Sequence, residues 1–157
     1  MAIETEVAVD PQALAEQVAQ AMFARDRAAQ MLGMTVDAVG PGYAQVSMRV
    51  RDDMINGHHI CHGGLTLSLA DTAFAYACNS DNHNTVGAAC SMDYLRPAFE
   101  GDRLTAEAVE RHLAGRSGIF DVTVSNQNGD KIGLFRGKSH RVKGAVLDAL
   151  QSAQPQS

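Results

Sequence analysis

The chain has 157 residues and a formal net charge of −5 at pH 7. This length suits one domain with a sizeable core. The acidic balance does not favour nucleic acid or an anionic membrane as a partner, and no apolar stretch reaches the ~20 residues that span a bilayer. The N-terminus lacks the basic start and apolar core of a secretory signal. Three cysteines make no disulfide framework, so we expect a reduced, cytoplasmic protein.

The first predicted element is an amphipathic helix that follows a flexible lead-in over residues 1–10. Asp10 and Pro11 suit its N-cap and its first helical position. Apolar residues then recur at helical spacing until the helix ends near Gly33. We expect this helix to pack on the surface of the body, within a single domain over 11–143. A tail over 144–157 is expected to be disordered at its end.

Strand patterns lie on both sides of a central helix. Alternation of apolar with polar residues predicts strands over 34–39, 43–50, 86–94, 104–108, 120–124 and 132–134. The last two are joined around Asn128-Gly129, the strongest short hairpin signal. One helix with five or six mostly antiparallel strands predicts an α+β fold, in which a sheet wraps around a helix.

The most informative stretch is His62-Gly63-Gly64 with the apolar and small residues from Leu65 to Cys78. Such a run predicts a helix that is buried on all sides. Asp71 is its only charged residue, and no cation shares its helical face. We therefore expect Asp71 to be a buried, unpaired carboxylate with a shifted pKa.

Two glycines at a helix start let a substrate approach the backbone closely. The first N–H groups of a helix have no internal partners, so they can hold a carbonyl oxygen that becomes negative during a reaction. A carboxylate such as Asp71 can then attack the carbonyl carbon or activate a water. Gly63 and Asp71 are eight residues apart. That is roughly 12 Å along one helix, so we expect a symmetric dimer to pair Gly63 with the partner subunit's Asp71.

Asn56, His62-Gly63-Gly64 and the segment from Leu69 to Ala75 closely resemble, at this spacing, the hotdog-fold acyl-CoA thioesterases. The match is closest to the PaaI type, which acts on phenylacetyl-CoA in bacterial phenylacetate degradation. The resemblance runs from the leading helix to the last strand, and it includes Asp93 to Ala98 and Gly115 to Gly118.

The resemblance implies a hotdog fold, a curved antiparallel sheet around a central helix, in dimers that assemble into tetramers. It implies that Asp71 is the catalytic carboxylate, as nucleophile or general base, and that the Gly63 N–H polarises the thioester carbonyl. Asn56 and His62 would lie beside this carbonyl. The residues expected to contact substrate or CoA are Gly64, Arg116, Ser117 and Gly118. An aryl-acyl group such as (hydroxy)phenylacetyl is expected, with no metal and no organic cofactor.

Other interpretations remain open at this point. A hotdog hydratase or dehydratase acting on acyl thioesters is one, although such enzymes usually pair a histidine base with a carboxylate on the helix. A non-catalytic acyl-CoA-binding protein is another. The segment from His58 to His62 resembles a set of metal ligands, but adjacent residues of an extended loop point in opposite directions. The basic residues Arg136, Lys138, His140 and Arg141 suit either CoA phosphates or a solvated face.

Overall fold

The structure is a computed structural model that describes residues 8–152. Its elements in chain order are α1 (Pro11–Phe23), α2 (Arg27–Met31), β1 (Thr35–Gly40), β2 (Tyr43–Arg49), a short 3-10 helix (Asp52–Met54), α3 (Gly63–Cys78), β3 (His83–Tyr94), β4 (Arg103–Ala114), β5 (Ser117–Ser125), β6 (Lys131–Ala145) and α4 (Val146–Ser152). Most of the predicted lead-in and the predicted disorder at the end of the tail lie outside the described residues. The division into domains stays a prediction.

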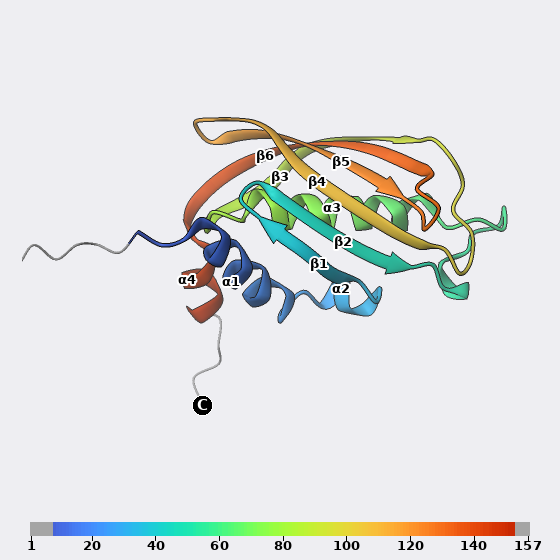
Figure 1. Cartoon of the computed structure of the whole chain (residues 1–157), viewed down its shortest axis with the longest axis horizontal. Helices are drawn as coiled ribbons and strands as arrows, with labels where there is room; N and C mark the ends of the chain where they lie inside the picture. The colour runs from blue at the N-terminus through green and yellow to red at the C-terminus, as the bar shows by residue number, and fades with distance from the viewer. Residues whose placement is uncertain (1–7, 153–157) are drawn as a thin grey trace, which may run out of the picture.

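One antiparallel sheet of six strands wraps around α3, in the order β1-β2-β4-β5-β6-β3. Figure 1 shows this sheet curving over one side of the helix, with α1 and α4 together at one end. The α+β prediction of a sheet wrapped on a central helix is confirmed. The two edges of the sheet are β1 and β3, so β3 is paired along one side only, with β6.

The core lies between α3 and the sheet, and Phe74 is at its centre. Its ring contacts those of Phe120 and Phe135, with both centroid distances at 5.6 Å. Side chains on β5 alternate strictly between buried and half-buried, as a strand with one face on a core requires. Glycines allow the close approach of the helix: a Cβ on Gly137 would lie 2.8 Å from Phe74 Cζ.

Three features differ from the sequence prediction. The leading helix is not continuous to Gly33: α1 ends at Phe23 and α2 restarts because the Asp26 carboxylate accepts the Ala29 N–H at 3.0 Å and caps the new helix. The helix α4 lies in the segment predicted as a tail, after a β6 that reaches Ala145. Finally, α3 is not buried on all sides, because the sheet covers only one of its faces.

Two predictions about local structure are confirmed. The Asp10 carboxylate caps α1, accepting the N–H groups of Gln12 and Ala13 at 3.4 and 3.2 Å. The β5–β6 hairpin turns at Asn128-Gly129, where Gly129 has a φ of 81° that favours glycine. In the described part of the chain, no helix is long and apolar enough to cross a membrane.

We predict that Gly137→Ala destabilises the protein. The new methyl group would meet Phe74 and Phe135 at 2.8 and 2.9 Å, and overpacking of this kind costs about 1–3 kcal/mol. Urea unfolding followed by circular dichroism measures the loss. Gly57→Ala is the matched control, since no atom lies within 4 Å of its Cβ position. An unchanged unfolding midpoint for Gly137→Ala would contradict this account of the helix–sheet contact.

Candidate active site

The N-terminus of α3 is capped by a histidine side chain. His62 Nδ1 accepts the N–H of Gly64 at 2.9 Å, and the His62 backbone N–H donates to the carbonyl of Met54 at 2.8 Å. A ring nitrogen that accepts an N–H carries no proton, so the other ring nitrogen carries it in the neutral imidazole. The cap holds Gly64 and leaves Gly63 aside: the Gly63 N–H has no acceptor among the described residues.

Tyr94, at the end of β3, packs against the first residue of α3. Its hydroxyl donates to the carbonyl of Gly63 at 3.0 Å, and its ring carbons lie 3.2 Å from where a Cβ on Gly63 would be. Only glycine fits this contact without a shift of the ring. A cavity of about 500 Å³ opens beside it, lined by Gly63, Thr66, Tyr94 and Leu95 among others. The free N–H therefore lies next to a space that a small acyl group can enter.

Asn56 shapes the loop that leads into α3. Its side-chain oxygen accepts the N–H groups of His58 and Ile60 at 2.9 and 3.4 Å. Its backbone N–H also donates to Ile60 at 2.8 Å, which closes the loop. The side-chain N–H groups of Asn56 have no acceptor among the described residues, so they remain available to a ligand. No cluster of three metal-ligating side chains is found in the described part of the chain.

Asp71 lies two turns along α3, on the face that the sheet leaves uncovered. The expectation of a buried carboxylate is wrong for the single chain, because Asp71 is exposed. Its side chain has no hydrogen bond or ion pair among the described residues. Desolvation by its surroundings raises the pKa of the Asp71 carboxyl above its ordinary value. An unpaired carboxylate with a raised pKa is suited to accept a proton.

Arg116, Ser117 and Gly118 lie at the opposite end of the sheet from Gly63. Arg116 lies in the turn between β4 and β5, and Ser117 and Gly118 begin β5, where Ser117 is paired with His140 of β6 beside the start of β3. Arg116 is exposed. One chain therefore brings together Asn56, His62, Gly63 and Gly64, but it leaves both Asp71 and the Arg116 turn apart from them.

Two of the four basic residues near the last strand already have acidic partners. Arg136 donates to Asp121 at 2.7 and 2.9 Å and lowers the pKa of that carboxyl. Arg141 pairs with Asp81.

Tyr94 was not among the predicted site residues. No local pattern indicates its contact with Gly63, because the two residues are 31 positions apart and meet only through the packing of β3 beside α3.

Comparison with known proteins places these features in a family. The model of the thioesterase superfamily matches residues 58–132. The chain is 48% identical over 130 residues to the acyl-coenzyme A thioesterase PaaI of Escherichia coli, covering 83% of this chain and 93% of that protein. It is 34% identical over 129 residues to a putative esterase of Archaeoglobus fulgidus, covering 82% and 84% of the two chains.

Solved structures agree with this assignment. The structure of the E. coli PaaI protein from the phenylacetic acid degradation operon matches with a TM-score of 0.85 at 47% identity, covering 87% of this chain and 99% of that chain. A mutant of the phenylacetic acid degradation protein PaaI from Thermus thermophilus matches with a TM-score of 0.72 at 38% identity, covering 74% and 100%.

Fold and similarity together define the class of protein, a hotdog-fold thioester hydrolase, and confirm the resemblance seen in the sequence. The chain belongs to the thioesterase superfamily, in which it is of the PaaI type.

We predict that His62→Ala lowers the free energy of unfolding by about 0.5–2 kcal/mol, the usual cost of losing an N-cap side chain. His62→Asn should restore most of that loss, since asparagine also accepts an N–H at this position. Chemical unfolding measures both variants. A free energy of unfolding for His62→Asn as low as that for His62→Ala would contradict a capping role of the His62 side chain.

Proposed function

We propose that this enzyme hydrolyses an acyl-CoA thioester to the free acid and CoA. The observation that carries the proposal is the free N–H of Gly63 at the capped start of α3, next to a cavity. The thioester carbonyl oxygen would accept this N–H, which lies at the positive end of the helix dipole and stabilises the oxyanion. The name of the E. coli relative, acyl-coenzyme A thioesterase, supports the same reaction.

Asp71 is the proposed catalytic carboxylate. As general base it takes a proton from water while the water oxygen bonds to the carbonyl carbon. The C–S bond then breaks, and the proton passes to the CoA sulfur. As nucleophile it would itself bond to that carbon and expel CoA, and water would then hydrolyse the resulting anhydride. The Gly63 N–H has the same role on either route.

The proposed site is completed by a second copy of the chain. The strand β3 has 12 residues and is an edge of the sheet, and its residues 86–91 are exposed. A long unpaired edge invites pairing with another strand. We infer that two copies join edge to edge along β3 around a twofold axis, which lays their α3 helices side by side. Such a dimer would bring the partner subunit's Asp71 to Gly63.

The same dimer would explain the position of the Arg116 turn. This turn lies beside the start of β3, whereas Tyr94 at the end of β3 contacts Gly63. Antiparallel pairing of two β3 strands puts the start of one beside the end of the other. The partner subunit's Arg116, Ser117 and Gly118 would then approach the site, where an arginine suits the phosphates of CoA. Gly64 and the free amide of Asn56 would contact the bound thioester.

The proposed acyl group is (hydroxy)phenylacetyl or a related aryl-acyl group. This rests on similarity to the two PaaI proteins of phenylacetic acid degradation. We further propose that dimers assemble into tetramers. Free thiols at Cys61, Cys78 and Cys90 fit the reducing cytoplasm as the place of action.

We predict that Asp71→Asn lowers kcat about 10²–10⁴-fold, the loss expected for a positioned acid–base group. Release of CoA would be followed with a thiol-reactive dye, using phenylacetyl-CoA, hydroxyphenylacetyl-CoA, benzoyl-CoA and straight-chain acyl-CoAs.

Wild-type kcat should fall as the pH drops through a pKa above the ordinary aspartate value, because the base must be ionised. Equal rates in both proteins would exclude Asp71 as the catalytic group, and hydration of an enoyl-CoA in a parallel assay would favour a hydratase. Binding without turnover would favour a binding protein.

A second prediction tests whether the site is shared between subunits. Gly63→Pro removes the proposed oxyanion donor at a position where helices accept proline, and Gly63→Ala keeps the N–H as its packing control. Mixing inactive Gly63→Pro with inactive Asp71→Asn, after unfolding and refolding together, should restore about a quarter of wild-type activity, because half of the dimers then carry one intact site of two. No restoration would contradict a site shared between subunits.

A further inference from the structure

A second cavity, of about 380 Å³, lies at the opposite end of α3 from Gly63. Cys78 in its wall is 15 residues along the helix from Gly63, a rise of roughly 22 Å. The wall also includes Leu14 of α1, Leu113 of β4 and Phe120 of β5, which give the cavity an apolar body. Burial raises the pKa of the Cys78 thiol to about 12, so it adds a neutral surface. The volume is in the range of small-molecule sites.

One polar group in this cavity has no partner among residues 8–152. The side-chain oxygen of Ser139 is buried, with the residue 1% exposed, and it makes no hydrogen bond to any residue that the structure describes. It lies beside Gly118 of the neighbouring strand, where a side chain would leave no room for it, since a Cβ on Gly118 would come within 2.6 Å. A buried hydroxyl without a partner costs about 1–3 kcal/mol. Ser139 lines the cavity, so a molecule bound there could supply the missing partner.

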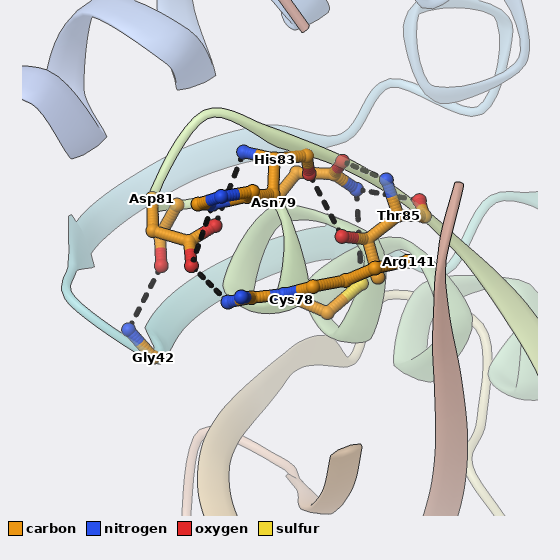
Figure 2. A network of polar contacts seen from close by, with 8 residues as sticks. Gly42, Cys78, Asn79, Asp81, His83, Thr85 and Arg141 are labelled. Atoms are coloured by element: carbon orange, nitrogen blue, oxygen red, sulfur yellow. Dashed lines mark hydrogen bonds and ion pairs between the residues drawn. The ribbon is translucent and has the colours of Figure 1, made fainter. Parts of the chain in front are cut away.

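Hydrogen bonds and ion pairs link the polar residues at and beside the rim of the cavity (Figure 2). Arg141 pairs with Asp81, which also accepts the backbone N–H of His83 at 3.2 Å. Asn79 ties the end of α3 to the start of β3: its side chain donates to the carbonyl of Thr85 and accepts the Thr85 N–H, at 3.0 and 2.9 Å. Among the described residues that line the cavity, Arg141 is the only cation, and its ion pair with Asp81 leaves none free to attract an anion.

The remaining charge at the mouth is acidic. Glu110 lines the cavity and has no ion pair among the described residues. With Arg141 and Asp81 cancelling each other, the lining carries a net negative charge. A carboxylate, such as the free acid released by thioester hydrolysis, would be repelled by this charge. A cation buried beside Ser139 would find only a neutral hydroxyl and no carboxylate to pair with, so its burial would be costly. An uncharged molecule fits both constraints.

We propose that this cavity binds a small, uncharged amphipathic molecule, whose aromatic or branched aliphatic body packs against Leu14, Leu113 and Phe120 and whose oxygen hydrogen-bonds to Ser139. Within one chain this cavity lies at the other end of α3 from Gly63, and the proposal does not depend on the function proposed above.

Amide NMR spectra of ¹⁵N-labelled full-length protein test the site, with three probes of one shape: benzyl alcohol, benzoate and benzylammonium. Benzyl alcohol should bind best and should shift the amide signals of Ser139, Cys78 and Thr85. Ser139→Ala, which removes only the hydroxyl, should weaken binding about 3- to 10-fold, the loss of one neutral hydrogen bond. Leu113→Trp, which fills the mouth, should abolish it.

Two controls give the opposite expectation. Ser125→Ala makes the same substitution at the far end of β5, and Asp71→Asn alters only the thioester site; both should leave the affinity for benzyl alcohol unchanged. The proposal is overturned by shifts confined to Gly63 and Gly64, by an unchanged affinity in Ser139→Ala, or by benzoate binding best. The proposal is also overturned if benzyl alcohol, at a concentration on the order of 10 mM, shifts no amide signal of the residues that line the cavity. A bound water would then be the partner of Ser139.

Discussion

The packing of Phe74 against the sheet is the contact on which the rest of the structure depends. Its ring packs on Phe120 and Phe135, over a place on β6 where Gly137 leaves no room for a side chain. This contact sets the position and rotation of α3 relative to the strands. The position of α3 in turn fixes where its two ends and its uncovered face lie. These three regions differ in their polar groups and in their surroundings.

The uncovered face and the free edge of β3 belong together. A helix that packs on a sheet with one side leaves the other side to solvent or to a partner. Asp71 lies on that side, and β3 presents unpaired backbone groups next to it. A sheet edge with unpaired backbone groups is costly in an isolated chain, and the pKa of the Asp71 carboxyl is raised although the residue is exposed. A symmetric dimer would account for both, and it gives a reason for the separation of Asp71 from Gly63.

The two ends of α3 differ in how their polar groups are satisfied. At the start, the His62 cap holds Gly64 and leaves one N–H free toward a cavity. At the end, Asn79 satisfies the backbone of the following turn, and the free group is the hydroxyl of Ser139 on a neighbouring strand. Polar groups left without partners inside a folded chain mark places where ligands can bind. In this chain, one such group lies near each end of α3.

Local patterns in the sequence determined the elements. The alternation of the strands, the Asn128-Gly129 hairpin, the Asp10 cap and the apolar run of α3 depend on neighbours a few residues away, so they could be predicted without coordinates. The joint role of Asp71 and the glycine-rich helix start stays a prediction, because one chain keeps Asp71 apart from Gly63. The break at Asp26 was missed, because helical spacing continues on both sides of it.

Only the tertiary structure decided which strand became an edge, which face of α3 stayed uncovered, and what lies beside each helix end. Asp71 is exposed because no helix or strand within residues 8–152 covers its face of α3. The periodicity of the helix alone does not predict this. The contact of Tyr94 with Gly63 and the cavity around Ser139 join residues from distant strands. Such contacts follow from the order in which strands pair, and that order is a property of the whole fold rather than of any local pattern.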